Sequence, residues 1–256
     1  MIKVKKLFYS PFKSMNMVAI NSLKLNKKYG IENDRVFCFT RFLNEKEALT
    51  FQNNKKSRNI INYLSMKHSA VLNHYNFQIN EKKISLFKSE KKLITINKNS
   101  FYDLQQIVDV FKKEENLKKD KIYLLYNIQN PFFDYMSENT ISLINLDSLE
   151  DFNQKIGGNV DLERFRANIY INGLNPFQEF NWIGKKITIS EKKFEVFAPI
   201  PRCKATQYPY KSSITDINVP YLLKQNYGHI NMGVYLRPTS SASIFLDSSI
   251  KCDHVW

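Results

Sequence analysis

Glycine and cysteine are both scarce in this chain. Among its 256 residues there are only 7 glycines and 3 cysteines. So few glycines leave little material for a glycine-rich phosphate loop or for long flexible linkers. The three cysteines form no CxxC pair, which argues against a disulfide framework and against a structural zinc site. This pattern favours a reducing compartment, and we expect a cytoplasmic protein.

Long hydrophobic runs are also missing. The longest apolar stretches, such as residues 122–125, fall far below the roughly 18 residues that are needed to span a bilayer. The N-terminal segment contains basic residues but lacks the apolar core of a signal peptide. The sequence therefore predicts neither a membrane span nor an export signal.

Acidic residues are outnumbered. Lys and Arg total 38 against 24 Asp and Glu, which gives a formal net charge of +14. Because the lysines are spread along the chain in short pairs, a solvated basic surface is one interpretation, and attraction of an anionic ligand or acidic partner is the other. The chain has no aromatic and basic stacking motif of the kind that binds RNA, so no nucleic-acid partner is expected.

Short strands dominate the first hundred residues. Segments such as Val18 to Leu25 and Arg35 to Phe42 are rich in β-branched and aromatic residues, and polar turns separate them. Many short strands at this spacing predict a barrel or a sandwich.

The hydrophobic period then changes. Apolar residues from Phe101 to Phe111 recur at steps of three and four, which predicts an amphipathic helix. The charged run Lys112 to Lys119 follows it and is the best candidate for a boundary. We therefore predict an N-terminal module over residues 1–118 and a second module over residues 119–256.

The second module is expected to combine strands with one clear helix. Asp147 is the expected N-cap of that helix, with Glu150 as its capping partner, and Gly157 can supply a left-handed stop. Strands are expected on both sides, including one at Phe165 to Asn172. The predicted fold class is thus mainly β with a few helices (α+β).

Cys203, in the segment PIPRCKAT, is the residue best suited to carry chemistry. It follows a strand and an expected turn at Pro199 to Pro201, so it should lie on a rigid loop. Arg202 and Lys204 flank it, and adjacent cations stabilise the thiolate that metal ligation or nucleophilic attack requires. The segment alone is equally compatible with a buried structural cysteine.

Basic residues at other strand ends could bind a phosphate. The segment RFRANIYI would place Arg164 and Arg166 on one face of a strand, where two guanidinium groups suit bidentate contacts. Lys13 with Ser14 follows a first strand, and Arg35 begins another. Each of these signals is weak alone, because an arginine at a strand edge is usually solvated.

Taken in order, five segments resemble the MOSC family and its associated N-terminal β-barrel domain. They are SPFKS, GIENDRVF, RFRANIYI with PFQEFNW, PIPRCKAT and GHINMGVY. These segments extend from residue 10 to residue 235, so the resemblance covers nearly the whole chain. The most similar functional relatives look like the mitochondrial amidoxime-reducing component and its bacterial counterparts.

The resemblance implies a MOSC β-barrel core packed against an N-terminal β-barrel-like module, with a molybdenum-molybdopterin cofactor (Moco) between them. Cys203 matches the family cysteine that ligates molybdenum, and a soft thiolate suits a metal already held by the pterin dithiolene. The remaining cofactor-binding positions that the resemblance implies are Lys13, Ser14, Arg35, Asn145, Ser148, Arg166, Arg202 and Tyr235.

Three positions depart from the family pattern. Ala167 replaces a usual proline, Phe180 replaces a usual acid, and Pro201 replaces a small polar residue before the arginine. The last change removes a hydroxyl that could contact the cofactor. None of the three removes Cys203 or the arginines.

The resemblance implies a molybdenum-dependent oxidoreductase that reduces N-hydroxylated small molecules, such as amidoximes, to amines. The chain shows no iron–sulfur cysteine set, haem motif or flavin fingerprint, so a separate donor protein must supply electrons. A cytochrome, a ferredoxin or a flavoprotein would serve. The alternative is a carrier that binds Moco or relays sulfur on Cys203.

Overall fold

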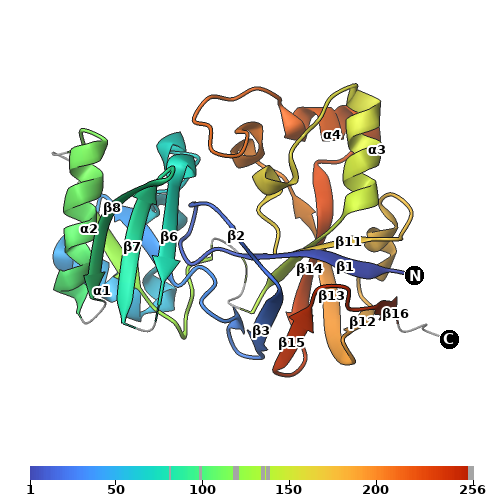
Figure 1. Ribbon diagram of the computed structural model, residues 1–256, viewed down its shortest axis with the longest axis horizontal. Coiled ribbons are helices and arrows are strands. Elements are labelled where there is room, and N and C mark those ends of the chain that lie inside the picture. Colours follow the sequence, from blue (N-terminus) through green and yellow to red (C-terminus); the bar gives the residue numbers. More distant parts are fainter. Residues whose placement is uncertain (81, 98–99, 118–120, 134–135, 137–138, 253–256) are drawn as a thin grey trace.

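The computed structural model describes residues 1–80, 82–97, 100–117, 121–133, 136 and 139–252. Figure 1 shows two parts side by side. One part holds helices α1 (Glu45–Asn53) and α2 (Phe101–Glu114) with a small sheet. The other holds a large sheet with helices α3 (Leu146–Ile156) and α4 (Val219–Tyr227).

The large sheet has eight strands in the order β16-β12-β13-β14-β10-β11-β1-β2. Only the β10–β11 pair is parallel among its ladders. Alternating side chains on these strands bury one aliphatic core that includes Val4, Leu143 and Val234. The strand bounds are β1 Lys3–Tyr9, β2 Val18–Ile20, β10 Ile141–Asn145, β11 Ile169–Asn172, β12 Lys186–Ile189, β13 Lys192–Pro201, β14 Asn231–Pro238 and β16 Ile250–Cys252.

The predicted barrel closure is wrong for this sheet. Its edges are β16 and β2, and no continuous ladder joins them in the described chain. An isolated bridge between Lys3 and Ser249 brings residues before β16 beside β1, so the sheet curves round without closing. Closure depends on the pairing of distant strands, which the alternation within each strand does not reveal.

The N-terminal part is built on smaller sheets. Strands β6, β7 and β8 form an antiparallel three-stranded sheet, and β5 pairs with β9. Phe39, Phe77 and Phe111 belong to the aromatic core between these sheets and α2. A third small sheet has the strand order β15-β3-β4. The bounds are β3 Ser22–Asn26, β4 Gly30–Ile31, β5 Phe37–Arg41, β6 Tyr75–Ile79, β7 Lys83–Lys88, β8 Lys91–Asn97, β9 Ile122–Tyr126 and β15 Ala242–Phe245.

The helix ends follow from local capping. The predicted helix beginning at Phe101 is present as α2, and the Ser100 hydroxyl accepts a hydrogen bond from Asp103 N. Helix α3 begins two residues earlier than expected, because Asn145 rather than Asp147 is its N-cap. Gly157 ends α3 in the left-handed conformation at φ 60°, as predicted.

The expected α+β class, mainly strands with a few helices, is confirmed. The division between residues 118 and 119 lies outside the described residues and stays a prediction. Strand β1 joins the large sheet through β11, while β9 pairs with β5, so both parts draw on distant chain segments. Within the described ranges, no helix is both long enough and apolar enough to span a membrane.

Candidate functional site

A cavity of about 460 Å³ is lined by residues from both parts of the molecule. We call it the cationic cavity, because five of its described lining residues carry positive charge: Lys13, Arg35, Lys67, Arg166 and Arg202. Cys203 and Tyr235 also line it. Segments more than 200 residues apart in the chain therefore meet at one place.

A smaller hollow of about 170 Å³ adjoins this cavity. It shares Lys13, Arg35, Lys67, Arg166 and Cys203 with the larger one and adds Ser14 to the set. Seven of the nine candidate residues thus line one or both spaces: Lys13, Ser14, Arg35, Arg166, Arg202, Cys203 and Tyr235.

Cys203 lies just beyond the end of β13. The expected turn at Pro199 to Pro201 is wrong, because these residues continue the strand. Its register shifts between Pro199 and Pro201, where a residue without an N–H group is tolerated. The Cys203 carbonyl accepts hydrogen bonds from Thr206 N and Oγ1, both at 2.9 Å, while the residue itself is exposed. The backbone is held and the thiol is accessible.

Arg202 is buried beneath this loop. Its Nε donates to Met232 O at 3.0 Å, its Nη2 donates to the same carbonyl, and its Nη1 donates to Phe165 O at 2.9 Å. Burial lowers the pKa of Arg202. Because carbonyl groups already occupy its donors, Arg202 fixes the start of the Cys203 loop against β14 and contributes a positive charge to the cavity wall.

Arg35 and Lys13 come from the N-terminal part. Arg35 Nη1 pairs with Asp34, and its Nη2 donates to Arg166 O at 3.3 Å. Lys13 is only 7% exposed, and its ammonium lies 4.8 Å from the ring centroid of Tyr63. Both cations are therefore held in position by the chain.

Arg166 differs from Arg35 and Lys13 in its surroundings. Its backbone is left-handed at φ 54°, and its guanidinium lines both hollows. Burial and the nearby Arg35 lower the pKa of Arg166 to about 9, which still leaves it charged at neutral pH. Among the residues that the structure describes, no carboxylate forms an ion pair with it. A partly buried cation without such a partner favours an anionic ligand.

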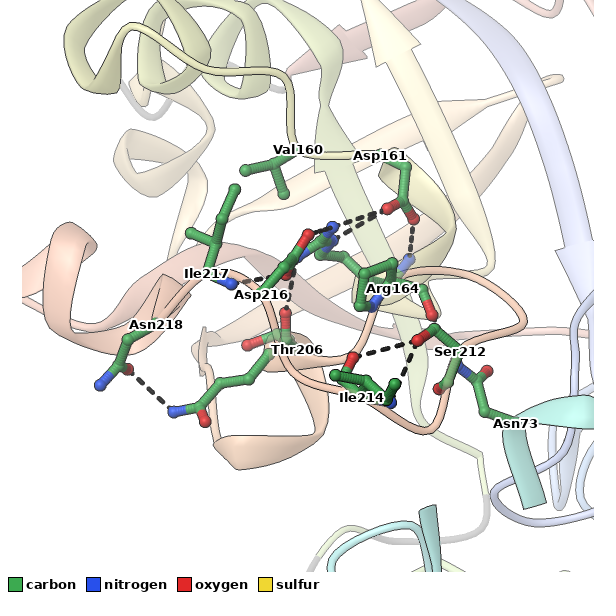
Figure 2. Close-up of polar contacts among 12 residues, drawn as sticks. Asn73, Val160, Asp161, Arg164, Thr206, Ser212, Ile214, Asp216, Ile217 and Asn218 are labelled. Carbon is green, nitrogen blue, oxygen red and sulfur yellow. Dashed lines mark hydrogen bonds and ion pairs between the residues drawn. The ribbon is translucent and has the colours of Figure 1, made fainter. Parts of the chain in front are cut away.

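The predicted pairing of Arg164 with Arg166 on a strand is wrong. Residues Leu162–Phe165 form a 3₁₀ helix, and β11 begins only at Ile169. Figure 2 shows Arg164 between the carboxylates of Asp161 and Asp216, with nitrogen–oxygen distances of 2.9 to 3.1 Å. Burial works in the opposite direction, but these two carboxylates raise the pKa of Arg164. Arg164 is therefore a structural residue outside the cavity.

Asn145 and Ser148 are placed away from the cavity. Asn145 caps α3 and donates to the carbonyls of Leu174 and Asn175. The Ser148 hydroxyl lies 2.9 and 3.0 Å from the carboxylate oxygens of the buried Glu179. Burial raises the pKa of Glu179 to about 7. These contacts fasten the segment before β12 to α3, and they bring neither residue to Cys203.

Tyr235 reaches the cavity from β14 and stacks on Phe197 at 5.9 Å between ring centroids. Gly233, two residues earlier, has φ 81°, and a Cβ there would lie 2.3 Å from Leu143 O. Only glycine lets β14 approach β10 this closely. The second glycine in GHINMGVY, Gly233, thereby positions Tyr235 two residues later.

Sequence reasoning missed several lining residues. Asn168 Oδ1 accepts hydrogen bonds from Ser142 N and Oγ, and its Nδ2 donates to Phe8 O at 3.2 Å, so it ties three strands together under the cavity. A buried asparagine at the start of β11 could have been noticed as a polar residue before an apolar run. Lys67 had no such signal, because it looks like any surface lysine.

The donor set fits Moco. The described part of the chain gathers no group of three or more His, Cys, Asp or Glu that could hold a metal ion. Cys203 would thus be a single protein ligand, which suits a metal that brings its own chelate. The cations around it suit a phosphate group, with Arg166 offering donors that no described carboxylate occupies.

Comparisons with known proteins identify a domain family over the second half of the chain. Residues 130–251 match the family model of the MOSC domain. Among solved structures, the YuaD protein of Bacillus subtilis is 11% identical with a TM-score of 0.45, covering 98% of this chain and 94% of its own. YiiM from Geobacillus stearothermophilus is 15% identical with a TM-score of 0.36, covering 44% and 54%. No curated protein matches the chain.

Proposed function

We propose that this chain, whose residues 130–251 match the family model of the MOSC domain, binds Moco in the cationic cavity and reduces N-hydroxylated small molecules, such as amidoximes, to amines. The single observation that carries the proposal is the meeting of the exposed Cys203 and the cation Arg166 in one cavity. One supplies a soft ligand for the metal and the other a site for the cofactor's phosphate.

The chain's own residues would divide the work of binding. Cys203 would ligate the metal from a loop that Arg202 and the Thr206 hydrogen bonds hold in place. Arg166 and Lys13 would offset the negative charge of the phosphate in the smaller hollow, which both of them line. Arg35, already paired with Asp34, would orient Arg166 through its carbonyl.

When bound, Moco would supply the two-electron chemistry that removes the oxygen of the N-hydroxyl group. The net reaction consumes two electrons and two protons and releases one water for each amine formed. The cavity walls would hold the substrate near Cys203, where Phe165, Ile200 and Ile230 offer apolar contacts. The electrons would come from a separate donor protein, and the net charge of +14 favours an acidic one.

The exposed thiol of Cys203 also favours a second candidate function. A carrier that hands over Moco, or that holds sulfur on Cys203 as a persulfide, would need the same accessible cysteine and the same cations. A carrier would release its cargo readily, whereas an enzyme would retain its cofactor through many turnovers.

The test is the molybdenum content of protein purified from a host that makes Moco, compared between wild type and Cys203→Ala. We expect near-stoichiometric metal in the wild type and at least tenfold less in the variant. Unchanged far-UV circular dichroism would exclude unfolding as the cause. Turnover of benzamidoxime with an artificial electron donor then separates the enzyme from the carrier. No molybdenum in either protein would contradict the proposal.

A further inference from the structure

Lys67 lies on a fixed turn at the edge of the cationic cavity. The backbone N–H groups of His68 and Ser69 donate to Ser65 O at 2.8 and 2.9 Å. Met66 is 4% exposed and anchors the turn in the N-terminal core. Between these anchored neighbours, Lys67 is exposed, yet it lines both the cavity and the adjoining hollow. Lys67 is therefore a cation of the cavity lining that solvent reaches.

The five cations of the cavity differ in what surrounds them. Arg202 donates to carbonyls, Arg35 pairs with Asp34, and Lys13 is buried against Tyr63. Arg166 faces the hollow where the proposed phosphate site lies. Lys67 is the most exposed of the five, so a ligand that enters from solvent meets it before the others. The described lining residues include no Asp or Glu that would neutralise it.

Part of the cavity lining is apolar. Phe133, Phe165, Ile200 and Ile230 line the same cavity. An apolar wall with one solvent-exposed cation suits a molecule with a hydrophobic body and an anionic group at one end. A neutral molecule would gain nothing from Lys67, and a cationic molecule would be repelled by the positive potential of the cavity.

On the basis of the proposed function, we propose that Lys67 is a specificity residue that selects N-hydroxylated substrates bearing a carboxylate or phosphate group on an apolar body. The substrate would approach with its N-hydroxyl group toward Cys203 and its anionic end toward Lys67. The reaction at the nitrogen is unchanged, so Lys67 acts on substrate binding and leaves the chemical step alone.

The experiment uses Moco-loaded protein and three substrates of one shape: benzamidoxime, its para-carboxylate and its para-phosphonate. We expect the wild type to show a KM about twofold to fivefold lower for the carboxylate than for benzamidoxime, with similar kcat, since one exposed charge pair supplies an effect of this order. Comparing the phosphonate with the carboxylate shows whether a dianion is preferred over a monoanion. In Lys67→Ala the KM values of the three substrates should converge, and Lys67→Arg should restore the difference.

Lys91→Ala is the matched control, because it removes one exposed lysine from the start of β8, outside the cavity lining. It should keep the KM difference and the wild-type molybdenum content, and the rates of all variants are compared per bound molybdenum. Normal turnover without any preference for the anionic substrates would overturn the role of Lys67 and leave the proposed function standing. Turnover of none of the three by molybdenum-loaded protein would overturn the proposed function and this inference with it.

Discussion

Two arginines that lie two residues apart in the chain occupy opposite electrostatic environments. Arg164 has its side chain only 2% exposed and bonds to both Asp161 and Asp216. Arg166 lines the cationic cavity, where the largest charge effect on its pKa comes from another arginine, Arg35, and Asp34 opposes it with a smaller effect. Two carboxylates form ion pairs with Arg164, whereas no carboxylate among the described residues forms one with Arg166. A cation that folding alone does not satisfy is a candidate for ligand binding, whereas a satisfied one is a candidate for stability.

The largest expected effect on the free energy of unfolding is that of replacing Arg164, which carboxylates already pair with. Arg164→Ala should lower the free energy of unfolding by about 2–3 kcal/mol, because it leaves Asp161 and Asp216 without their shared partner and opens a buried space. Urea denaturation measures this change. Lys5→Ala is the control, because its ion pair with Asp247 is exposed and should contribute less than about 1 kcal/mol. Equal losses in both variants would remove the contrast between buried and exposed pairs.

The buried carboxyl group of Glu179 extends this comparison to an acidic residue. Glu179 is fully buried, and its neighbours Ser148 and Asn145 are neutral, so burial raises its pKa to about 7. Since the ordinary value is about 4.5, the folded state binds the proton more tightly than the unfolded state does. The resulting stability is complete below about pH 4.5 and is lost as the pH rises through 7.

Between pH 4.5 and pH 8, the wild type should therefore lose about 2–3 kcal/mol that Glu179→Gln does not lose. Urea denaturation of both proteins across this range measures the difference, which removes the contribution of all other titrating groups. At pH 8 the Gln variant should be the more stable protein. Parallel pH profiles for the two would show that Glu179 has an ordinary pKa in the folded state.

Which residues come together was easier to predict from the sequence than the backbone around them. Cys203, Arg166 and Tyr235 stand in short segments with a recognisable order, and the structure brings them into one cavity. The strand expected from Phe165 begins only at Ile169, because Arg166 adopts a left-handed conformation that no local propensity favours. The resemblance grouped Asn145 and Ser148 with the cofactor, yet Ser148 contacts Glu179 and Asn145 caps α3.

Long-range pairing accounts for the remaining differences between the prediction from the sequence and the structure. The alternation of apolar residues indicated the strands but left open whether the sheet closes, since closure is set by which edges meet. Lys67 could not be distinguished from the other lysines in sequence. It lines the cavity only because Met66 buries itself in a core formed by segments far along the chain.

The smallest expected effect on the free energy of unfolding is that of replacing Arg166, and the sign of this change is what distinguishes the two arginines. Arg166→Met keeps most of the side-chain volume and removes a partly buried charge that no described carboxylate balances. The free energy of unfolding of cofactor-free protein should therefore change by less than about 0.5 kcal/mol or increase, while the molybdenum content falls about tenfold. Urea denaturation and elemental analysis of the same preparations measure both quantities. If Arg166→Met destabilised the fold as much as Arg164→Ala does and retained its metal, Arg166 would be a structural residue as well. The contrast between the two arginines would then no longer identify the ligand site, because both would serve the fold.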